Sequence, residues 1–389
     1  MRKLGIFLSA IVFTVMAYVP VMAESIEDRI ERIEQQLDAN WKFYGNVMMS
    51  TFYEKYKAKD LRNFGAIDDK GTTWGLNTDA TIGATVEIGN IEGVFEYEHN
   101  VDPSLSYLYG VWNFMPEGKL VVGYDDAPLE FGISNQVYYA NNGLSGFGSL
   151  DGDAAAQIKL IYKGFQFALI DPNPGMNDLG FGGTDVVLPR IEAAYDFSLG
   201  PLAGKIMGGY KTFKVVADED MPTELEETVN SWITGLGLLY DAGPFYFGIN
   251  GFYGENIGAF GQAVIANPED TSPQIEPLDI IGLNSGMPYW TGNEIIDAKT
   301  FGVAAALGYK HNDMLSFEVG YGYQEDKWKF AGMEEKLKGQ SYYLNATITV
   351  AKGFYIVPEV GVMRYKCKGL ADIDAGKLTY FGAKWQIEF

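Results

Sequence analysis

Carboxylates are the most numerous groups in this chain that could do chemistry, and one segment rich in glycine gathers several of them. Asp and Glu total 51 among 389 residues, against 29 Lys and Arg, so the formal charge is -22. The segment 126–153 and the residue before it hold five acids and two adjacent tyrosines: Asp125, Asp126, Glu130, Tyr138, Tyr139, Asp151 and Asp153. In a confined aqueous space such carboxylates would favour cations, because charges are screened less there than in bulk water. An ordinary surface loop whose acids are only solvated is the alternative.

Catalytic and metal-binding chemistry is poorly supplied elsewhere. Cys367 stands alone, which excludes an intramolecular disulfide and a site built on several cysteines. His99 and His311 are the only imidazoles, and neither has an evident Ser or acid partner by spacing. Acids at 218–220 and 224–227 could bind divalent cations at the surface, although a solvated loop explains them equally well. We therefore predict no enzyme, no cofactor and no metal site, and the negative charge disfavours nucleic acid.

The first residues have the pattern of an export signal. Arg2 and Lys3 precede an apolar run at 4–17, and the small residues expected at a cleavage site follow at 21–23. The run is too short for a membrane anchor. We predict a signal peptide over 1–23 that is cleaved after Ala23.

A short heptad pattern follows at 24–40. Ile26, Ile30, Ile33 and Leu37 are spaced four, three and four residues apart, with charged residues between them. Isoleucine at the core positions favours assemblies of three or more helices. We predict a short periplasmic coiled coil or helix here. A single amphipathic helix or a solvated linker is the alternative.

The remainder of the chain, 41–389, alternates apolar and polar side chains in runs of about ten residues. Phe301, Val303 and Leu307 share one face of a run, for example, and Gly302 and Ala304 the other. No later segment has about 18 consecutive apolar residues, so a membrane-spanning form of this chain must be a closed barrel that pairs every backbone group. We predict an all-β fold, a 16-stranded antiparallel transmembrane β-barrel with a short N-terminal helical stub. The predicted strands are 41–53, 73–88, 91–99, 105–114, 119–125, 154–162, 165–170, 189–197, 203–215, 230–240, 245–255, 299–310, 314–325, 339–350, 353–366 and 377–389.

The connections and the last strand support this interpretation. Tight turns follow each even-numbered strand, whereas most of the other connections are longer, as in outer-membrane barrels. The last strand places an apolar and aromatic set on one face: Phe381, Trp385, Ile387 and Phe389. With these features, 41–389 resembles the trimeric sixteen-stranded porins of Gram-negative bacteria, and 24–40 resembles the short N-terminal coiled coil that some of them carry.

The resemblance implies a location, partners and a function. It implies a homotrimer in the outer membrane, surrounded by outer-membrane lipids, whose terminal strand the barrel assembly machinery reads. It also implies that loop 126–153 folds inward and narrows a channel for passive diffusion of small hydrophilic solutes and ions. A substrate-selective channel with an aromatic track of Tyr138, Tyr139 and Trp290 is the alternative, and a structural or enzymatic barrel is a further one.

The alternation also places charges on the face that would line the lumen: Glu87, Glu96, Glu98, Arg190, Glu192, Lys205, Lys211, Glu318, Glu359 and Lys384. General porins often set basic residues on early strands opposite the acidic loop, whereas the early strands here offer acids. We therefore predict a modest cation preference.

Two further features of the sequence each have two explanations. Apolar residues in 256–298 could cover the mouth or contact a neighbour, and apolar residues on both faces of 41–53 could mark a subunit contact or burial beneath an inward loop.

Overall fold

A computed structural model gives the arrangement of the chain. It describes residues 39–57, 70–99, 103–141, 143–152, 154–172, 183–186, 188–216, 226–258, 285–291, 294–369 and 373–389. The predicted signal peptide, 1–23, and all but the last two residues of the predicted coiled coil, 24–40, lie outside these ranges. Within them, no helix is both long enough and apolar enough to cross a membrane.

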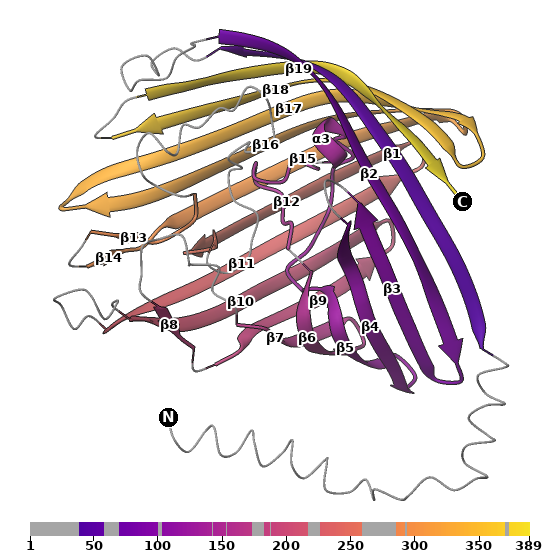
Figure 1. Ribbon diagram of the computed structural model, residues 1–389, viewed down its shortest axis with the longest axis horizontal. Helices are drawn as coiled ribbons and strands as arrows, with labels where there is room; N and C mark the ends of the chain where they lie inside the picture. The colour runs from indigo at the N-terminus through magenta and orange to yellow at the C-terminus, as the bar shows by residue number, and fades with distance from the viewer. Residues whose placement is uncertain are drawn as a thin grey trace, which may run out of the picture.

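Sixteen antiparallel strands of the described chain close into a ring (Figure 1). Each strand pairs with the next, and the first pairs with the last, from Asn46 opposite Glu388 to Lys57 opposite Lys377. The predicted all-β, sixteen-stranded barrel is therefore confirmed. The strands are β1 (Asn40–Lys57), β2 (Lys70–Ile88), β3 (Ile91–His99), β4 (Pro103–Met115), β5 (Gly118–Asp126), β6 (Ala154–Tyr162), β7 (Phe165–Ile170), β9 (Arg190–Leu199), β10 (Leu202–Val216), β11 (Glu226–Ala242), β12 (Phe245–Glu255), β15 (Lys299–Asn312), β16 (Leu315–Phe330), β17 (Met333–Ala351), β18 (Phe354–Lys368) and β19 (Ile373–Glu388).

Four short elements complete the described structure. β8 (Gly183–Asp185) pairs with the last residues of β10, Lys214 to Val216, beyond Tyr210, where the pairing of β10 with β9 ends. β13 (Tyr289–Trp290) and β14 (Ile295–Ile296) form a small hairpin of their own. The helix α3 (Tyr138–Asn141) lies within the ring (Figure 1).

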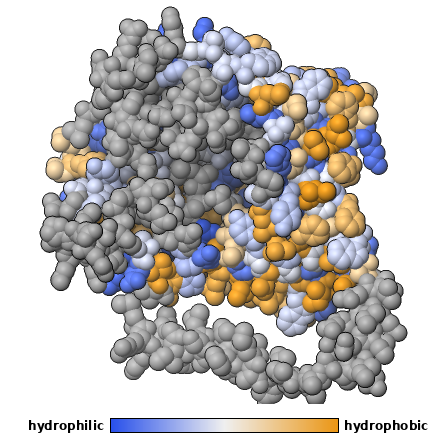
Figure 2. Space-filling model, viewed as in Figure 1, coloured by the Kyte–Doolittle hydropathy of each residue, from blue (hydrophilic) through white to orange (hydrophobic). Residues whose placement is uncertain are grey.

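The period of two along each strand separates an outer from an inner face. Large apolar side chains such as Phe301, Leu344 and Phe381 are exposed on the outer face, whereas Ala304 and Tyr343 are buried on the inner face. Figure 2 shows apolar side chains gathered over the outer surface of the barrel. An outward-facing apolar band of this kind is typical of barrels that stand in lipid.

The two rims of the barrel differ. Two-residue turns at 89–90, 116–117, 163–164, 200–201, 243–244, 313–314 and 352–353 gather at one rim, called here the short-turn rim. The C-terminus lies there too, because Phe389 and Gly45 exchange backbone hydrogen bonds of 2.9 and 3.0 Å. The wall also differs in height, since β16 and β17 have 16 and 19 residues but β6 and β7 only 9 and 6. The side of the barrel around β16 and β17, called here the tall wall, therefore extends further toward the opposite rim, called here the loop rim.

Candidate functional site: a lumen narrowed by an inward loop

The segment after β5 runs inside the barrel. Its apolar side chains pack on the inner wall in three groups. Leu129 and Leu150 contact Ile233 and Phe252 on β11 and β12. Ile133 and Leu144 pack with Ala304 and Tyr343, and Val137, Tyr138 and Phe147 join a cluster that reaches β1, β18 and β19. Because these side chains are withdrawn from water, the loop, and not an open lumen, occupies the space against β9–β19 and β1.

Glycines on the inner wall provide the room for this packing. A Cβ on Gly237 would lie 2.0 Å from the ring of Phe131, and one on Gly322 would lie 2.3 Å from the backbone oxygen of Phe147. On the loop side, Gly148 has a φ of +90° and lies against the backbone of β15 and β16. Its conformation and the close approach both require glycine. Glycines of the strands therefore shape the seat of the loop.

Three glutamates of the inner wall accept hydrogen bonds from loop backbone amides. Glu192 on β9 accepts from the N–H of Leu129 at 3.1 Å. Glu318 on β16 accepts from the N–H and the side-chain amide of Asn135, each at 2.6 Å.

Glu359 completes this set on β18. It accepts from the N–H groups of Val137 and Tyr138 at 2.8 and 3.0 Å, and the three glutamates are almost fully buried. Buried backbone N–H groups require an acceptor, and these wall carboxyl groups supply it. Three residues predicted as charges lining the lumen therefore act as anchors of the loop.

Tyr138 is also an anchor. Its hydroxyl donates to Glu54 at 2.9 Å, and its ring stacks on Tyr380 at 4.0 Å between centroids and meets the edge of Phe52. Tyr138 is only 1% exposed, so it cannot form the aromatic track considered from the sequence. On the inner face of β1, Met48 and Phe52 are buried beneath this loop, whereas the apolar outer residues Val47 and Met49 remain exposed.

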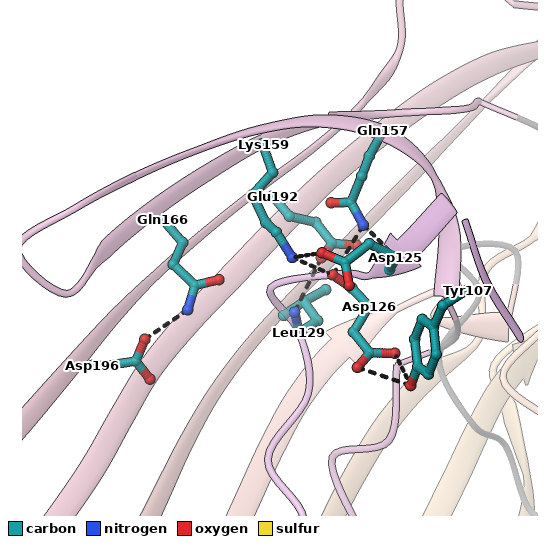
Figure 3. A network of polar contacts seen from close by, with 9 residues as sticks. All are labelled: Tyr107, Asp125, Asp126, Leu129, Gln157, Lys159, Gln166, Glu192 and Asp196. Atoms are coloured by element: carbon teal, nitrogen blue, oxygen red, sulfur yellow. Dashed lines mark hydrogen bonds and ion pairs between the residues drawn. The ribbon is translucent and has the colours of Figure 1, made fainter. Parts of the chain in front are cut away.

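The base of the loop is held by a polar network (Figure 3). Lys159 on β6 forms an ion pair with Asp125 at 2.6 Å and donates to the backbone oxygen of Asp126 at 2.7 Å. The hydroxyl of Tyr107 on β4 donates to the Asp126 carboxylate at 3.0 Å. Asp125 and Asp126 thus fix the point at which the chain leaves the wall, and Lys159 compensates the charge of Asp125.

Glu130 and Asp151 lie near one another where the loop leaves and returns. Burial, followed by the nearby negative charges of Asp126 and Asp151, raises the pKa of Glu130 to about 7. Burial also raises the pKa of Asp151, against the effect of a hydrogen bond from Ser145. Lys205 on β10 donates to the backbone oxygen of Glu130 at 3.1 Å. Glu130 is therefore a group that can gain or lose its charge near neutral pH.

The wall that faces the loop carries the other charges. Glu87, Glu96 and Glu98 lie on the inner face of β2 and β3, where Glu87 pairs with Lys42 at 3.1 Å and Glu98 accepts from a serine hydroxyl at 3.2 Å. Asp79, which sequence analysis missed, lies on the same face within electrostatic range of Glu96 and Glu98.

Basic side chains gather on another part of the wall, on β6, β9 and β10. Arg190 pairs with Glu192 at 3.1 Å, and Lys211 lies over the ring of Phe213. Lys384 on β19 donates to the side chain of Asn141 at 2.8 Å. The wall thus has an acidic side on β2 and β3 and a basic side next to the base of the loop. Among the described residues, no group of three or more His, Cys, Asp or Glu side chains is placed to hold a metal ion.

The remaining predicted site residues have the following positions. Tyr139 lies on α3, and Asp153 is outside the described residues. The aromatic terminal strand is β19, whose Phe381, Trp385, Ile387 and Phe389 are exposed on the outer face. The anchor Glu54 was also missed. The alternation along β1 could have revealed it, because it shares the inner face with Phe52 and lies one residue beyond the predicted end of that strand.

A second segment also enters the barrel near the loop rim. The indole of Trp328 on β16 donates to the backbone oxygen of Met287 at 2.9 Å, and Tyr289 meets the edge of Phe330. Trp328 and Cys367 are completely buried in the same cluster. Tyr289, in the long loop 256–298, therefore covers the inner wall of its own barrel, and most of the rest of that loop is outside the described residues.

No protein-family model and no curated protein matches the sequence. The structure is similar to that of the outer membrane channel DcaP of Acinetobacter baumannii, with a TM-score of 0.65 and 15% identity over 90% of this chain and 97% of that one. It is also similar to the anion-selective porin from Comamonas acidovorans, with a TM-score of 0.55 and 12% identity over 90% and 100% of the two chains.

A third similar structure is OmpT, an outer membrane protein of Vibrio cholerae, in its trimer form. Its TM-score is 0.54 with 16% identity, and the match covers 90% of this chain and 99% of that one. At these identities the likeness concerns the fold alone. The chain thus has the fold of outer-membrane channels and porins over nearly its whole described length.

Proposed function

We propose that this protein is a non-enzymatic outer-membrane porin through which small hydrophilic solutes and ions diffuse passively. The observation that carries the proposal is a closed ring with an apolar outer face, in which loop 126–153 packs on part of the inner wall while Glu87, Glu96 and Glu98 on the inner face of β2 and β3 remain at least partly exposed. A recess of about 360 Å³ beneath the loop, lined by polar groups such as Asn46, Asn135, Lys384 and Gln386, is consistent with a watery passage. The fold shared with outer-membrane channels supports the same proposal.

The proposal includes a modest cation preference. The three wall glutamates that anchor the loop are withdrawn from the passage, so the preference would depend on Asp79, Glu96 and Glu98 on β2 and β3 and on Glu130. The basic side chains nearest the loop base are partly compensated by Asp125 and Glu192. The porin from Comamonas acidovorans is anion-selective, but at 12% identity its wall charges are not those of this chain. The expected selectivity is therefore argued from the charges of this chain alone.

The proposal also includes how the chain is exported and assembled. We propose that a signal peptide over 1–23 is removed after Ala23, that 24–40 forms a periplasmic coiled coil, and that three chains assemble as a homotrimer. The exposed aromatic face of β19 would be read by the barrel assembly machinery, and outer-membrane lipids would cover the outer face.

Planar-bilayer recordings test the channel and its selectivity. The purified chain should insert with discrete conductance steps, and the reversal potential under a KCl gradient should show a preference for K⁺. The double variant Glu96→Gln/Glu98→Gln should reduce that preference, whereas Glu117→Gln in a short turn should leave it unchanged. No conductance, or a clear anion preference of the unmodified chain, would contradict the proposal.

A substrate-selective channel remains the second candidate, and one observation favours it. Two segments enter the barrel, the loop after β5 and the hairpin of β13 and β14, so that little of the tall wall near the loop rim faces open space. Liposome swelling with sugars and amino acids of graded size separates the candidates. A general pore ranks solutes by size, whereas a selective channel passes one chemical class faster than smaller molecules of another class.

A further inference from the structure

Basic side chains form a belt on the outer face of the tall wall at the loop rim. They come from six neighbouring strands around β18, and the period of two points them away from the lumen. The belt consists of Lys55, Lys57, Lys299, Lys327, Lys329, Lys336, Lys338, Arg364, Lys366, Lys368 and Lys377 on β1 and β15–β19. A chain of net charge -22 thus concentrates more than a third of its 29 basic residues on one small part of its surface.

The strand register places several of these cations directly opposite one another. Lys338 faces Lys366 and Lys336 faces Lys368 across β17 and β18. On the next strand pairs, Lys377 of β19 faces both Arg364 and Lys57. Like charges in such cross-strand pairs repel and destabilise a sheet. The arrangement therefore favours an external anion between the strands.

The protein's own carboxylates compensate only one side of the belt. Glu325 and Glu334 pair with Lys327, Lys336 and Lys338, with Lys338 at 2.6 Å from Glu325. In the part of the chain that the structure describes, no carboxylate forms an ion pair with the exposed cations of the other side: Lys57, Lys366, Lys368 and Lys377. These four side chains, from adjacent strands, form the open part of the belt.

The belt begins where the apolar outer face ends. Along β18, Val360 is exposed on the outer face, and Arg364 follows four residues later, about 13 Å further along the strand. The Arg364 guanidinium lies 6.0 Å from the ring centre of Tyr342. β19 runs in the opposite direction, so its exposed Phe381 lies in the apolar band and Lys377, four residues earlier in the sequence, lies nearer the loop rim. Long basic side chains just beyond an aromatic girdle are placed at the depth of lipid head groups.

A shallow apolar groove lies on the same strands below the belt. It has a volume of about 390 Å³, and its outer rim is formed by Phe317, Leu344, Val360 and Phe381. The smaller Ala346 and Pro358 leave the hollow between these side chains. An acyl chain fits such a groove, and its head group would then reach the basic belt.

We propose that the outer face of β16–β19 and β1 binds an anionic, phosphate-bearing lipid of the outer leaflet, with its head group on the basic belt and an acyl chain in the groove. The proposal rests on the proposed membrane placement, in which the short-turn rim and the C-terminus face the periplasm and the loop rim faces outward. Phosphate is the fitting anion because it bears more than one charge and can neutralise lysines of two facing strands at once. A neutral lipid would leave the facing cations uncompensated.

The test measures lipid retained by the purified full-length chain in a zwitterionic detergent. Native mass spectrometry counts bound diphosphoryl lipid A, its dephosphorylated form and phosphatidylcholine, with EDTA present so that divalent cations do not bridge charges. We expect diphosphoryl lipid A to be retained and the other two not. Replacing Lys57, Lys366, Lys368 and Lys377 by Gln should lower its affinity about fivefold for each charge removed. The matched control, Lys163→Gln/Lys352→Gln, changes two lysines in turns of the opposite rim and should retain lipid as before.

A second variant tests the groove. Ala346→Trp fills it from the outer face without changing charge, and should lower retention of diphosphoryl lipid A while leaving the binding of inorganic pyrophosphate unchanged. Unchanged retention by the four-lysine variant, or an equal loss in the turn control, overturns the proposal. So does a loss of oligomers with unaltered lipid binding, because the belt would then contact a second copy of the chain. Conductance of the same variants in neutral bilayers reports on the channel separately, so that failure of one proposal is distinguishable from failure of the other.

Discussion

Glu318 holds Asn135 at both of its amides: one carboxylate oxygen accepts from the backbone N–H and the other from the side-chain NH₂, each at 2.6 Å. Glu318 also accepts from the hydroxyls of Tyr246 and Tyr343. Glu318 therefore acts as a clamp on the loop. If the loop moved, the backbone N–H and the side-chain NH₂ of Asn135 would both lose their acceptor. The position of the loop inside the barrel therefore depends on anchors in the wall.

Glu318→Gln should loosen the clamp. The substitution places an NH₂ group against donors and removes the charge, so we expect a loss of about 1.5–3 kcal/mol in the free energy of unfolding. A displaced loop should also raise the single-channel conductance. The control is Glu325→Gln on the outer face of the same strand, which should change stability by less than about 1 kcal/mol. An unchanged conductance with normal stability would show that the clamp does not position the loop.

Gly322→Ala should displace the loop without changing any charge. A Cβ at this position would lie 2.3 Å from the backbone oxygen of Phe147, so the loop backbone must move away from β16. Overpacking of this kind costs about 1–3 kcal/mol. We expect a lower melting temperature and noisier single-channel currents. Gly132→Ala is the control, because nothing lies within 4 Å of the added atom. Equal behaviour of the two variants would argue against a tight seat for the loop.

Tyr138 and Glu54 should be energetically coupled. Tyr138→Phe removes the donor and leaves the buried Glu54 carboxylate with an unmet oxygen, which should cost about 1–3 kcal/mol. Glu54→Gln should cost a similar amount, and the double variant should cost less than the two single variants together. Urea unfolding of the four proteins in detergent measures the coupling. Strictly additive effects would mean that the hydrogen bond contributes nothing to the stability of the loop.

The cation preference should fall as the pH is lowered through neutrality. The pKa of Glu130 is raised to about 7, mainly by burial, so its charge is present at pH 8 and mostly absent at pH 6. The raised pKa of Glu130 also affects the free energy of unfolding. Its stabilising contribution is fully present below the usual Glu pKa and is lost as the pH rises through about 7. Lowering the pH from 8 to 6 should therefore raise the stability while it lowers the cation preference. Reversal potentials between pH 8 and 6 check the first effect. In Glu130→Gln the pH step should be missing, whereas in Glu117→Gln it should persist.

Cys367 should resist thiol reagents in the folded barrel. Its side chain faces inward but is completely covered by the cluster around Trp328. A maleimide should label it only after denaturation. Lys119→Cys, at an exposed inward-facing position of β5, is the positive control and should react in the folded state. Rapid labelling of Cys367 in the native chain would mean that the lumen is open at this level.

The sequence by itself determined the strands, their number, the closed all-β fold and the face on which each side chain lies. It could do so because the period of two is local: each residue's face follows from its immediate neighbours along the chain. The same period could have added Glu54 to the inner face and the lysines of β18 to the outer face.

Only the tertiary structure decided what those faces meet. Nothing local to Glu192, Glu318 or Glu359 shows that a loop more than 35 residues away in the sequence places its backbone amides against them. These glutamates were predicted as pore charges, and the fold uses them as anchors instead. The facing lysines of β17, β18 and β19 are likewise defined by register between strands, because hydrogen bonds between strands, and not the alternation within one strand, decide which residues lie opposite one another.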